Sequence, residues 1–184
     1  MTREPAGHVP SGAFVVHAAK LQKVAGTTRR EHRHGVIEDL ATVGADVPEG
    51  SEVDADLTLV SYPGGVSASG VVSAPWQGEC RRCGGPVTGE VRVSVRERFA
   101  RNGGEAADED AYPLDGDELD LEPLARDAVL LELPLAPLCD EGCRGLCPEC
   151  GANRNVESCT CGGPVDLRWS ALDALRSEEG PGSA

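Results

Sequence analysis

Residues 87–96 read Val-Thr-Gly-Glu-Val-Arg-Val-Ser-Val-Arg, with valines at positions 91, 93 and 95 separated by polar side chains. A period of two puts apolar side chains on one face of a strand and polar ones on the other, as in a half-buried strand. Residues 53–59, Val-Asp-Ala-Asp-Leu-Thr-Leu, alternate in the same way. Residues 66–74 are expected to pair with them across a turn at Pro63-Gly64-Gly65. These patterns predict an antiparallel sheet.

The remaining apolar patterns predict one further strand and two helices. Residues 13–16 favour a short first strand. Asp120 can cap a helix that runs to about Leu133 and ends before Pro134. Its apolar face would hold Leu121, Leu124, Ala125, Ala128 and Leu131. A second, short helix is expected from Asp166, with Trp169, Leu172 and Leu175 on one side.

The charge balance argues against a generally basic protein. The chain has 184 residues, 17 Lys and Arg against 31 Asp and Glu, and a net charge of −14. A global basic footprint, the usual mark of autonomous nucleic-acid binding, is therefore absent. No secretory signal and no apolar run of about 18 residues is visible, so we expect a cytoplasmic protein without membrane contact. Disulfides seldom persist in that compartment.

The eight cysteines fall into four close pairs, namely Cys80-x2-Cys83, Cys139-x3-Cys143, Cys147-x2-Cys150 and Cys159-x-Cys161. Such spacings let two sulfurs reach one metal ion, and eight thiols suffice for two tetrahedral zinc sites. A site of four thiolates leaves no open position for water or substrate, so these zinc ions would be structural. The favoured grouping joins the last two pairs in a local zinc-ribbon-like site and the first two pairs in a second site.

Three other interpretations of the cysteines stay open. Four disulfides are possible in principle but conflict with the missing secretory signal. Cys80 and Cys83 could form a redox pair, because Arg81 and Arg82 between them would lower a thiol pKa. An iron–sulfur cluster also uses four thiolates. A generic zinc-ribbon adaptor between proteins remains a further functional alternative.

Two groups of basic residues are candidates for contacts with nucleic-acid phosphates. The alternative is that they offset neighbouring acids on a solvated surface. Aromatic residues for base stacking are scarce, at 3% of the chain. The candidates are Lys20, Lys23, Arg29, Arg30 and Arg33 in one segment, and Arg92, Arg96, Arg98 and Arg101 along the strand at 87–96 and beyond it.

Three blocks of sequence resemble one known family. They are Gly78-Glu79-Cys80-Arg81-Arg82-Cys83 with Pro86-Val87, then residues 133–139 (Leu-Pro-Leu-Ala-Pro-Leu-Cys), then residues 143–151 (Cys-Arg-Gly-Leu-Cys-Pro-Glu-Cys-Gly). Together with Asp166-Leu167-Arg168-Trp169 they resemble the YceD family of large ribosomal RNA subunit accumulation proteins. The usual Asp-Pro-Arg-Trp of that family is Asp-Leu-Arg-Trp here, and the last pair of ligands is Cys159-Thr160-Cys161.

The resemblance implies a non-enzymatic ribosome biogenesis factor that supports accumulation or maturation of large-subunit rRNA. The implied partners are that rRNA or a basic large-subunit ribosomal protein, with no small-molecule substrate. The acidic run from Glu105 to Glu122 would then be a solvated loop or a docking segment for the basic protein.

We predict an α+β, β-rich fold: an antiparallel sheet or partly open barrel, a following helix, and a small C-terminal zinc-ribbon-like module. Residues 1–12 are expected to be disordered, as is the tail at 177–184. Residues 13–138 would form the β-rich domain, with a flexible acidic loop at 102–118 and the helix at about 120–133. Residues 139–176 would form the cysteine-rich module.

Overall fold

The structure is a computed structural model that describes residues 12–101 and 111–161. The second helix expected from Asp166 and the expected tail at 177–184 lie outside the described residues. So do residues 1–11 of the expected N-terminal segment and residues 102–110 of the expected acidic loop.

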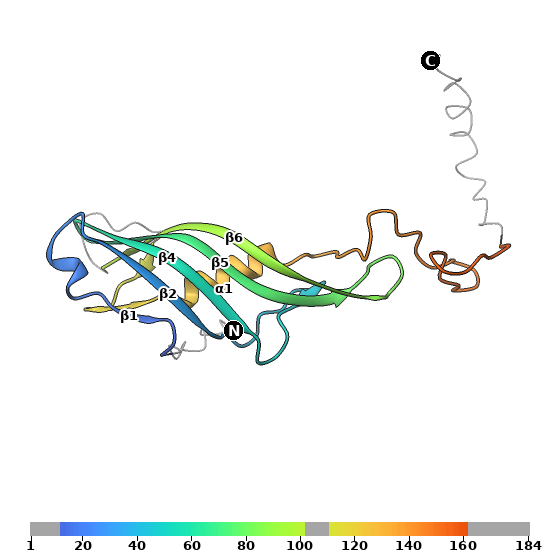
Figure 1. Cartoon of the computed structure of the whole chain (residues 1–184), viewed down its shortest axis with the longest axis horizontal. Helices are drawn as coiled ribbons and strands as arrows, with labels where there is room; N and C mark the ends of the chain where they lie inside the picture. The colour runs from blue at the N-terminus through green and yellow to red at the C-terminus, as the bar shows by residue number, and fades with distance from the viewer. Residues whose placement is uncertain (1–11, 102–110, 162–184) are drawn as a thin grey trace, which may run out of the picture.

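The described chain is strand-rich with one α-helix, so the prediction of an α+β, β-rich fold is confirmed. Its main sheet has six strands in the order β2-β4-β5-β6-β7, with β3 beside β5, and a separate two-stranded sheet pairs β1 with β8 (Figure 1). Every pairing is antiparallel except the short parallel one between β6 and β7, and the sheets do not close into a barrel. The elements are β1 (Val15–His17), the 3-10 helix η1 (Leu21–Lys23), β2 (Thr28–Val36), β3 (Ala45–Asp46), β4 (Glu52–Tyr62), β5 (Gly65–Glu79), β6 (Pro86–Ala100), β7 (Tyr112–Pro113), β8 (Glu118–Asp120) and α1 (Glu122–Glu132).

The two central hairpins follow the alternation in the sequence. The β4–β5 turn lies at Pro63 and Gly64, where Gly64 has a positive φ of 99°. Strand β5 continues to Glu79, further than its apolar pattern indicated. Gly70 allows this passage, because a Cβ there would lie 2.0 Å from the carbonyl oxygen of Asp56 on β4. The long β5–β6 hairpin therefore carries Cys80 to one end of the molecule.

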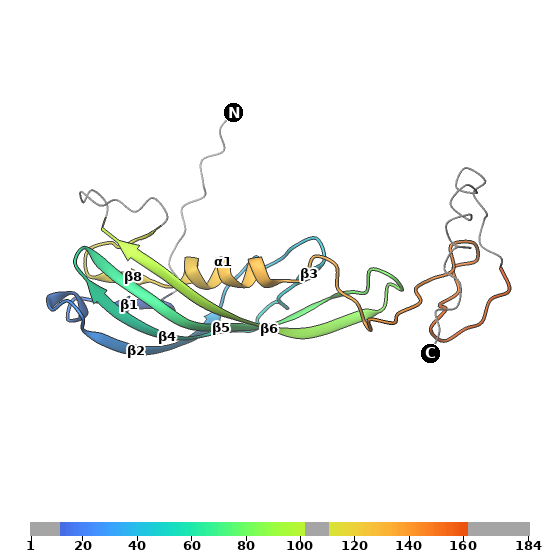
Figure 2. The same cartoon turned by 90° about the horizontal axis from the view of Figure 1, so that it is seen from above.

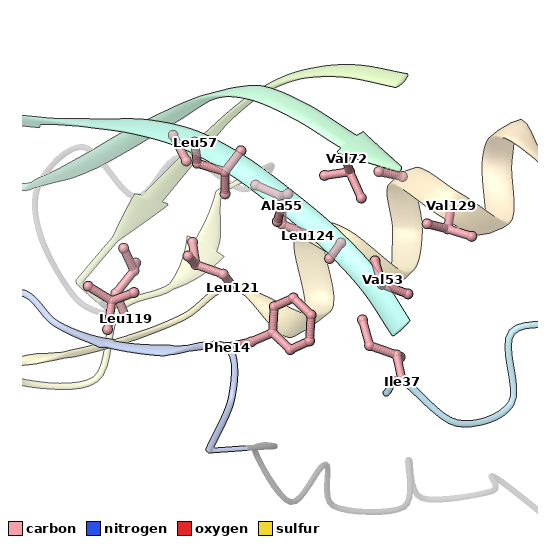
Figure 3. Close-up of a cluster of buried hydrophobic side chains, with 14 of the residues drawn as sticks. Phe14, Ile37, Val53, Ala55, Leu57, Val72, Leu119, Leu121, Leu124 and Val129 are labelled. Carbon is pink, nitrogen blue, oxygen red and sulfur yellow. The ribbon is translucent and has the colours of Figure 1, made fainter. Parts of the chain in front are cut away.

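The core lies on one face of the main sheet. Figure 2 shows α1 along that side of the sheet only, and β1 and β8 flank it. Buried side chains from the sheet, such as Val53 and Val72, meet Leu124 and Val129 of α1 there (Figure 3). Phe14, next to β1, is fully buried in the same cluster. No helix among residues 12–101 and 111–161 is long and apolar enough to cross a membrane.

The buried face of α1 differs from the prediction at Leu131, which is 88% exposed. The row Leu121, Ala125, Val129 and Leu133 is buried from end to end instead. Leu131 stands two residues from both Val129 and Leu133, which places it about 200° around the helix axis from them. The helix begins at Glu122, whose backbone N–H donates to the Asp120 carboxylate at 3.0 Å, so Asp120 caps the first turn from just outside it.

The expected flexible loop at 102–118 ends earlier than predicted. Tyr112 and Pro113 form β7 beside β6, and the adjacent Leu114 is buried. The Tyr112 ring stacks on Phe99 with a centroid separation of 5.3 Å, and its hydroxyl donates to Asp127 of α1 at 2.7 Å. Apolar burial at these positions outweighs the acidic composition of the surrounding sequence, because Tyr112 and Leu114 close one end of the core.

Truncation of Leu124 tests the packing of α1 on the sheet. Leu124 is only 1% exposed, so Leu124→Ala should lower the free energy of unfolding by about 2–5 kcal/mol. Leu131→Ala, on the exposed side of the same helix, should change it by less than about 0.5 kcal/mol. Urea denaturation of the reduced, metal-loaded protein measures both values. Equal losses in the two variants would contradict this packing.

Candidate metal centres

The first cysteine group joins the β5–β6 hairpin to the segment that follows α1. Cys80 comes directly after β5 and Cys83 lies in the hairpin turn, whereas Cys139 and Cys143 lie beyond the helix. The four Sγ atoms lie within 4.8 Å of one another. The Sγ atoms of Cys80 and Cys143 are 3.8 Å apart, and those of Cys83 and Cys139 are 3.6 Å apart.

These separations suit a shared ion and not a disulfide. Four thiolates held at about 2.3 Å from one tetrahedral ion stand about 3.8 Å apart. A disulfide would require about 2.05 Å between its sulfurs. The donor set of the first group therefore fits a thiolate-bound metal ion.

The second group is local in sequence. Cys147, Cys150, Cys159 and Cys161 also place their Sγ atoms within 4.8 Å of one another. Cys147 is buried, Cys159 is half-buried, and Cys150 and Cys161 are exposed. The structure thus collects the eight thiols in the same two sets of four that the spacings favoured, and either set could hold a metal ion.

Each group contains a turn of the same construction around its Cys-x2-Cys pair. In the first turn, the N–H of Gly84 donates to the carbonyl oxygen of Cys80 at 2.8 Å. The N–H of Cys80 donates to the carbonyl oxygen of Gly85 at 2.7 Å. In the second turn, the N–H of Gly151 donates to the carbonyl oxygen of Cys147 at 2.9 Å, and the N–H of Cys147 donates to the carbonyl oxygen of Ala152 at 2.8 Å. The two turns are equivalent, residue for residue.

The glycine of each turn has a left-handed backbone. Gly84 has φ 69° and Gly151 has φ 74°, a region that a side chain disfavours. The Gly after the second cysteine therefore has a specific conformational role. It lets the chain reverse so that both sulfurs of the pair face the same side.

Backbone N–H groups stabilise the thiolate of the first cysteine of each group. The pKa of Cys80 is lowered to about 6, chiefly by the backbone N–H of Cys139 and then by those of Arg82 and Cys83. The pKa of Cys147 is likewise lowered to about 6, by the backbone N–H groups of Cys150 and Glu149. Amide dipoles from these turns and from Cys139 are thus aimed at a sulfur that must lose its proton to bind a metal.

Another cysteine of each group, Cys139 in the first and Cys161 in the second, shows the opposite effect. The thiols of Cys143, Cys83 and Cys80 raise the pKa of Cys139 to about 12. Cys150 is the main cause that raises the pKa of Cys161 to about 12. Thiolates this close repel one another, so a full set of four in either group requires a cation among them.

Hydrogen bonds connect the two groups. Leu146 directly precedes Cys147, and its N–H donates to the carbonyl oxygen of Arg82 in the β5–β6 turn at 3.0 Å. The Asn155 side chain donates from Nδ2 to the Sγ of Cys143 at 3.2 Å, and its Oδ1 accepts from the N–H of Arg144 at 2.7 Å. The sequence reasoning missed Asn155, whose only signal is its place in the loop between Cys150 and Cys159.

Arg82 supports the first group from outside. Its guanidinium donates to the carbonyl oxygens of Glu141 at 2.8 Å and Cys143 at 3.0 Å, which holds the Cys139–Cys143 turn against the hairpin. This contact fixes the backbone around the thiols rather than the sulfur itself. Arg82 therefore braces the turn that carries Cys143.

The structure divides the candidate phosphate-binding residues between two faces of the sheet. Arg29 and Arg33 of β2 flank the buried carboxylate of Glu31, with 2.7 Å between Arg33 and Glu31. These two arginines lie on the core side of the sheet, beside the rim of the core. The candidates on the opposite face are Arg30, Arg92, Arg96 and Arg98. Lys20, Lys23 and Arg101 are exposed outside the strands.

Substitution of a turn glycine tests the shared construction. A Cβ at Gly84 would meet no heavy atom within 4 Å, so the penalty of Gly84→Ala is conformational alone. We expect a loss of about 1–2 kcal/mol in the free energy of unfolding of the metal-loaded protein. Gly12→Ala, also in open space but without a positive φ, should be close to neutral. A neutral Gly84→Ala in urea denaturation would rule out this role for the glycine.

Comparisons with known proteins find one family and several relatives. The family described as large ribosomal RNA subunit accumulation protein YceD matches residues 68–176, a range that includes all eight cysteines. An uncharacterised protein of Mycobacterium tuberculosis is 38% identical over 160 residues, which cover 79% of this chain and 77% of that protein. A relative in Mycobacterium leprae is 34% identical over 153 residues, covering 79% and 70%.

A chloroplast relative in Arabidopsis thaliana carries a functional name. It is described as large ribosomal RNA subunit accumulation protein YCED homolog 1 and is 37% identical over 68 residues, which cover 36% of this chain and 21% of the relative. No solved structure matches the chain. The family match spans β6, the helix α1 and both cysteine groups, and the chain therefore belongs to the YceD family.

Proposed function

We propose that this protein is a non-enzymatic ribosome biogenesis factor that supports accumulation or maturation of large-subunit rRNA in the cytoplasm. It acts by binding, either to that rRNA or to a basic large-subunit ribosomal protein. The observation that carries the proposal is the family match over residues 68–176, since the family is described by large ribosomal RNA subunit accumulation. The names of the chloroplast relatives of Arabidopsis thaliana and Zea mays support it.

Both cysteine groups hold structural zinc in this proposal. Zinc favours four-coordinate tetrahedral sites with thiolate ligands, and the sulfur separations of 3.6 Å and 3.8 Å in the first group fit such a site. Four sulfurs complete the coordination shell, so each ion would stabilise the fold without activating water or substrate. The ligands are Cys80, Cys83, Cys139 and Cys143 for one ion, and Cys147, Cys150, Cys159 and Cys161 for the other.

The burial of Cys80 favours this structural role over thiol–disulfide exchange. Exchange requires an accessible thiolate, whereas Cys80 is 2% exposed and its sulfur is surrounded by three further thiols. A low thiol pKa serves metal binding equally well, because the metal ligand is the thiolate. The Cys80–Cys83 pair is therefore better suited to hold an ion than to exchange disulfides.

Deletion of the gene in its host tests the proposal. Mature large-subunit rRNA should fall relative to small-subunit rRNA, with unprocessed large-subunit precursor retained, as measured by Northern blotting and gradient profiles. Wild-type protein should restore the ratio. Cys143→Ser should restore it poorly, because the first group then lacks a ligand, whereas Ser158→Ala beside the second group should restore it fully. An unchanged rRNA ratio after deletion would refute the function.

A further inference from the structure

The face of the main sheet opposite the core is polar and exposed. Along β6, Arg92, Ser94, Arg96 and Arg98 all point to this face and are exposed, while Val91 and Phe99 point to the core. In the described part of the chain, α1, β1 and β8 lie on the core side, as Figure 2 shows. A sheet face that residues 12–101 and 111–161 leave uncovered is available to a partner.

The strand register aligns the polar side chains of this face in rows. Arg30 of β2 pairs with Thr58 of β4, Thr58 with Ser69 of β5, and Ser69 with Arg96 of β6. Strands are about 4.8 Å apart, so the two arginines stand about 14 Å from each other across a floor of two hydroxyls. We call these four residues, with the next row Thr28, Val60, Ser67 and Arg98, the hydroxyl–arginine platform.

On this face Arg30, Arg96 and Arg98 lie toward the β4–β5 turn, whereas Arg92 shares a row with Asp54 through Ser73. The acids Glu52, Asp54 and Asp56 occupy the other end of β4, where His32 contacts Asp56 at 2.6 Å. Among the described residues, Arg30 and Arg96 make no ion pair. The backbone N–H of Arg101 donates to the carbonyl of Gly64 in the β4–β5 turn, which places this arginine at the same end of the molecule. Positive charge therefore gathers locally on a chain whose net charge is −14.

We propose that the hydroxyl–arginine platform binds the sugar–phosphate backbone of single-stranded RNA. Guanidinium groups recognise phosphates, and Ser and Thr hydroxyls donate to phosphate oxygens or accept from the ribose 2′-hydroxyl. Side chains on the same face of β6 repeat about every 6.7 Å, so Arg96 and Arg98 of the platform stand one such interval apart along an extended strand. This inference rests on the proposed function and selects rRNA over a ribosomal protein as the direct partner.

The chemistry of the platform also defines its specificity. The rows across it hold no aromatic ring on which a base could stack, and stacking is what usually retains unpaired bases. Binding should therefore be insensitive to base sequence and depend steeply on salt. A basic ribosomal protein is a poor occupant, because the arginines at both sides of the platform would repel it.

Salt-dependent binding of a fluorescein-labelled 20-nucleotide single-stranded RNA of mixed sequence tests this assignment. The reduced, zinc-loaded full chain should bind it with an affinity that falls linearly on a log–log plot against KCl. Each lost phosphate contact reduces the slope by about 0.7, so Arg30→Gln with Arg96→Gln should flatten it by about 1.4. Arg30→Lys with Arg96→Lys should retain the wild-type slope, because the charge remains.

A control of equal charge is available at the other end of the molecule. Arg81→Gln with Arg154→Gln removes two exposed arginines beside the cysteine groups and should leave the slope unchanged. The assignment is overturned if wild-type protein does not bind the RNA, or if the platform and control variants lose slope equally. It is also overturned if the wild type binds a basic large-subunit ribosomal protein through these arginines but not the RNA.

Complementation separates this assignment from the proposed function. The platform variant should fail to restore large-subunit rRNA in the deletion strain, while the control variant restores it. If the platform variant restores rRNA fully, the function stands and the platform is refuted. If deletion itself leaves rRNA unchanged, the function fails, and RNA binding in vitro then reports only on the surface.

Discussion

The meeting of four thiols at the tip of the β5–β6 hairpin fixes the course of the rest of the chain. Cys83 and Cys139 are separated by 55 residues, which include β6, β8 and α1. Closing a loop of that length with one covalent link would remove about 4 kcal/mol of unfolded-state entropy in the chain-entropy model. A shared ion would act in the same sense and would hold the chain after α1 against the hairpin. Gly44 packs beneath that return, since a Cβ there would lie 2.4 Å from the Leu135 carbonyl oxygen.

The resulting molecule separates stability from recognition. The cysteine groups lie at one end, beyond the β5–β6 hairpin, and the β4–β5 turn with η1 lies at the other (Figure 1). The thiol-rich end concentrates negative charge, and metal binding does not cancel it because four thiolates outweigh one divalent ion. The proposed RNA strand would therefore be favoured at the far end of the sheet face opposite the core, where Arg30 and Arg96 stand. The length of β5 and β6 sets the distance between the two ends.

Alternation made the strands at 53–59 and 87–96 predictable, and pair spacing made the two groups of thiols predictable. The continuation of β5 to Glu79 was not predictable. Glycines and Pro75 interrupt the apolar alternation of this strand, while its backbone pairing with β6 continues. The sequence also did not show that Arg29 and Arg30 lie on opposite faces of the sheet. Strand β2 is polar on both faces, so nothing in its sequence shows which arginines face the core rim beside Glu31. Only the pairing of β2 with the amphipathic β4 decides which side chains of β2 lie on the core side.

X-ray absorption at the zinc edge of the protein, purified under reducing conditions, tests the central claim most directly. The account predicts that zinc is the bound metal and that its first shell contains four sulfur scatterers at about 2.3 Å, averaged over both sites. Nitrogen or oxygen scatterers in that shell, or iron in place of zinc, would contradict two closed thiolate sites. The sulfur count decides whether all eight cysteines are ligands.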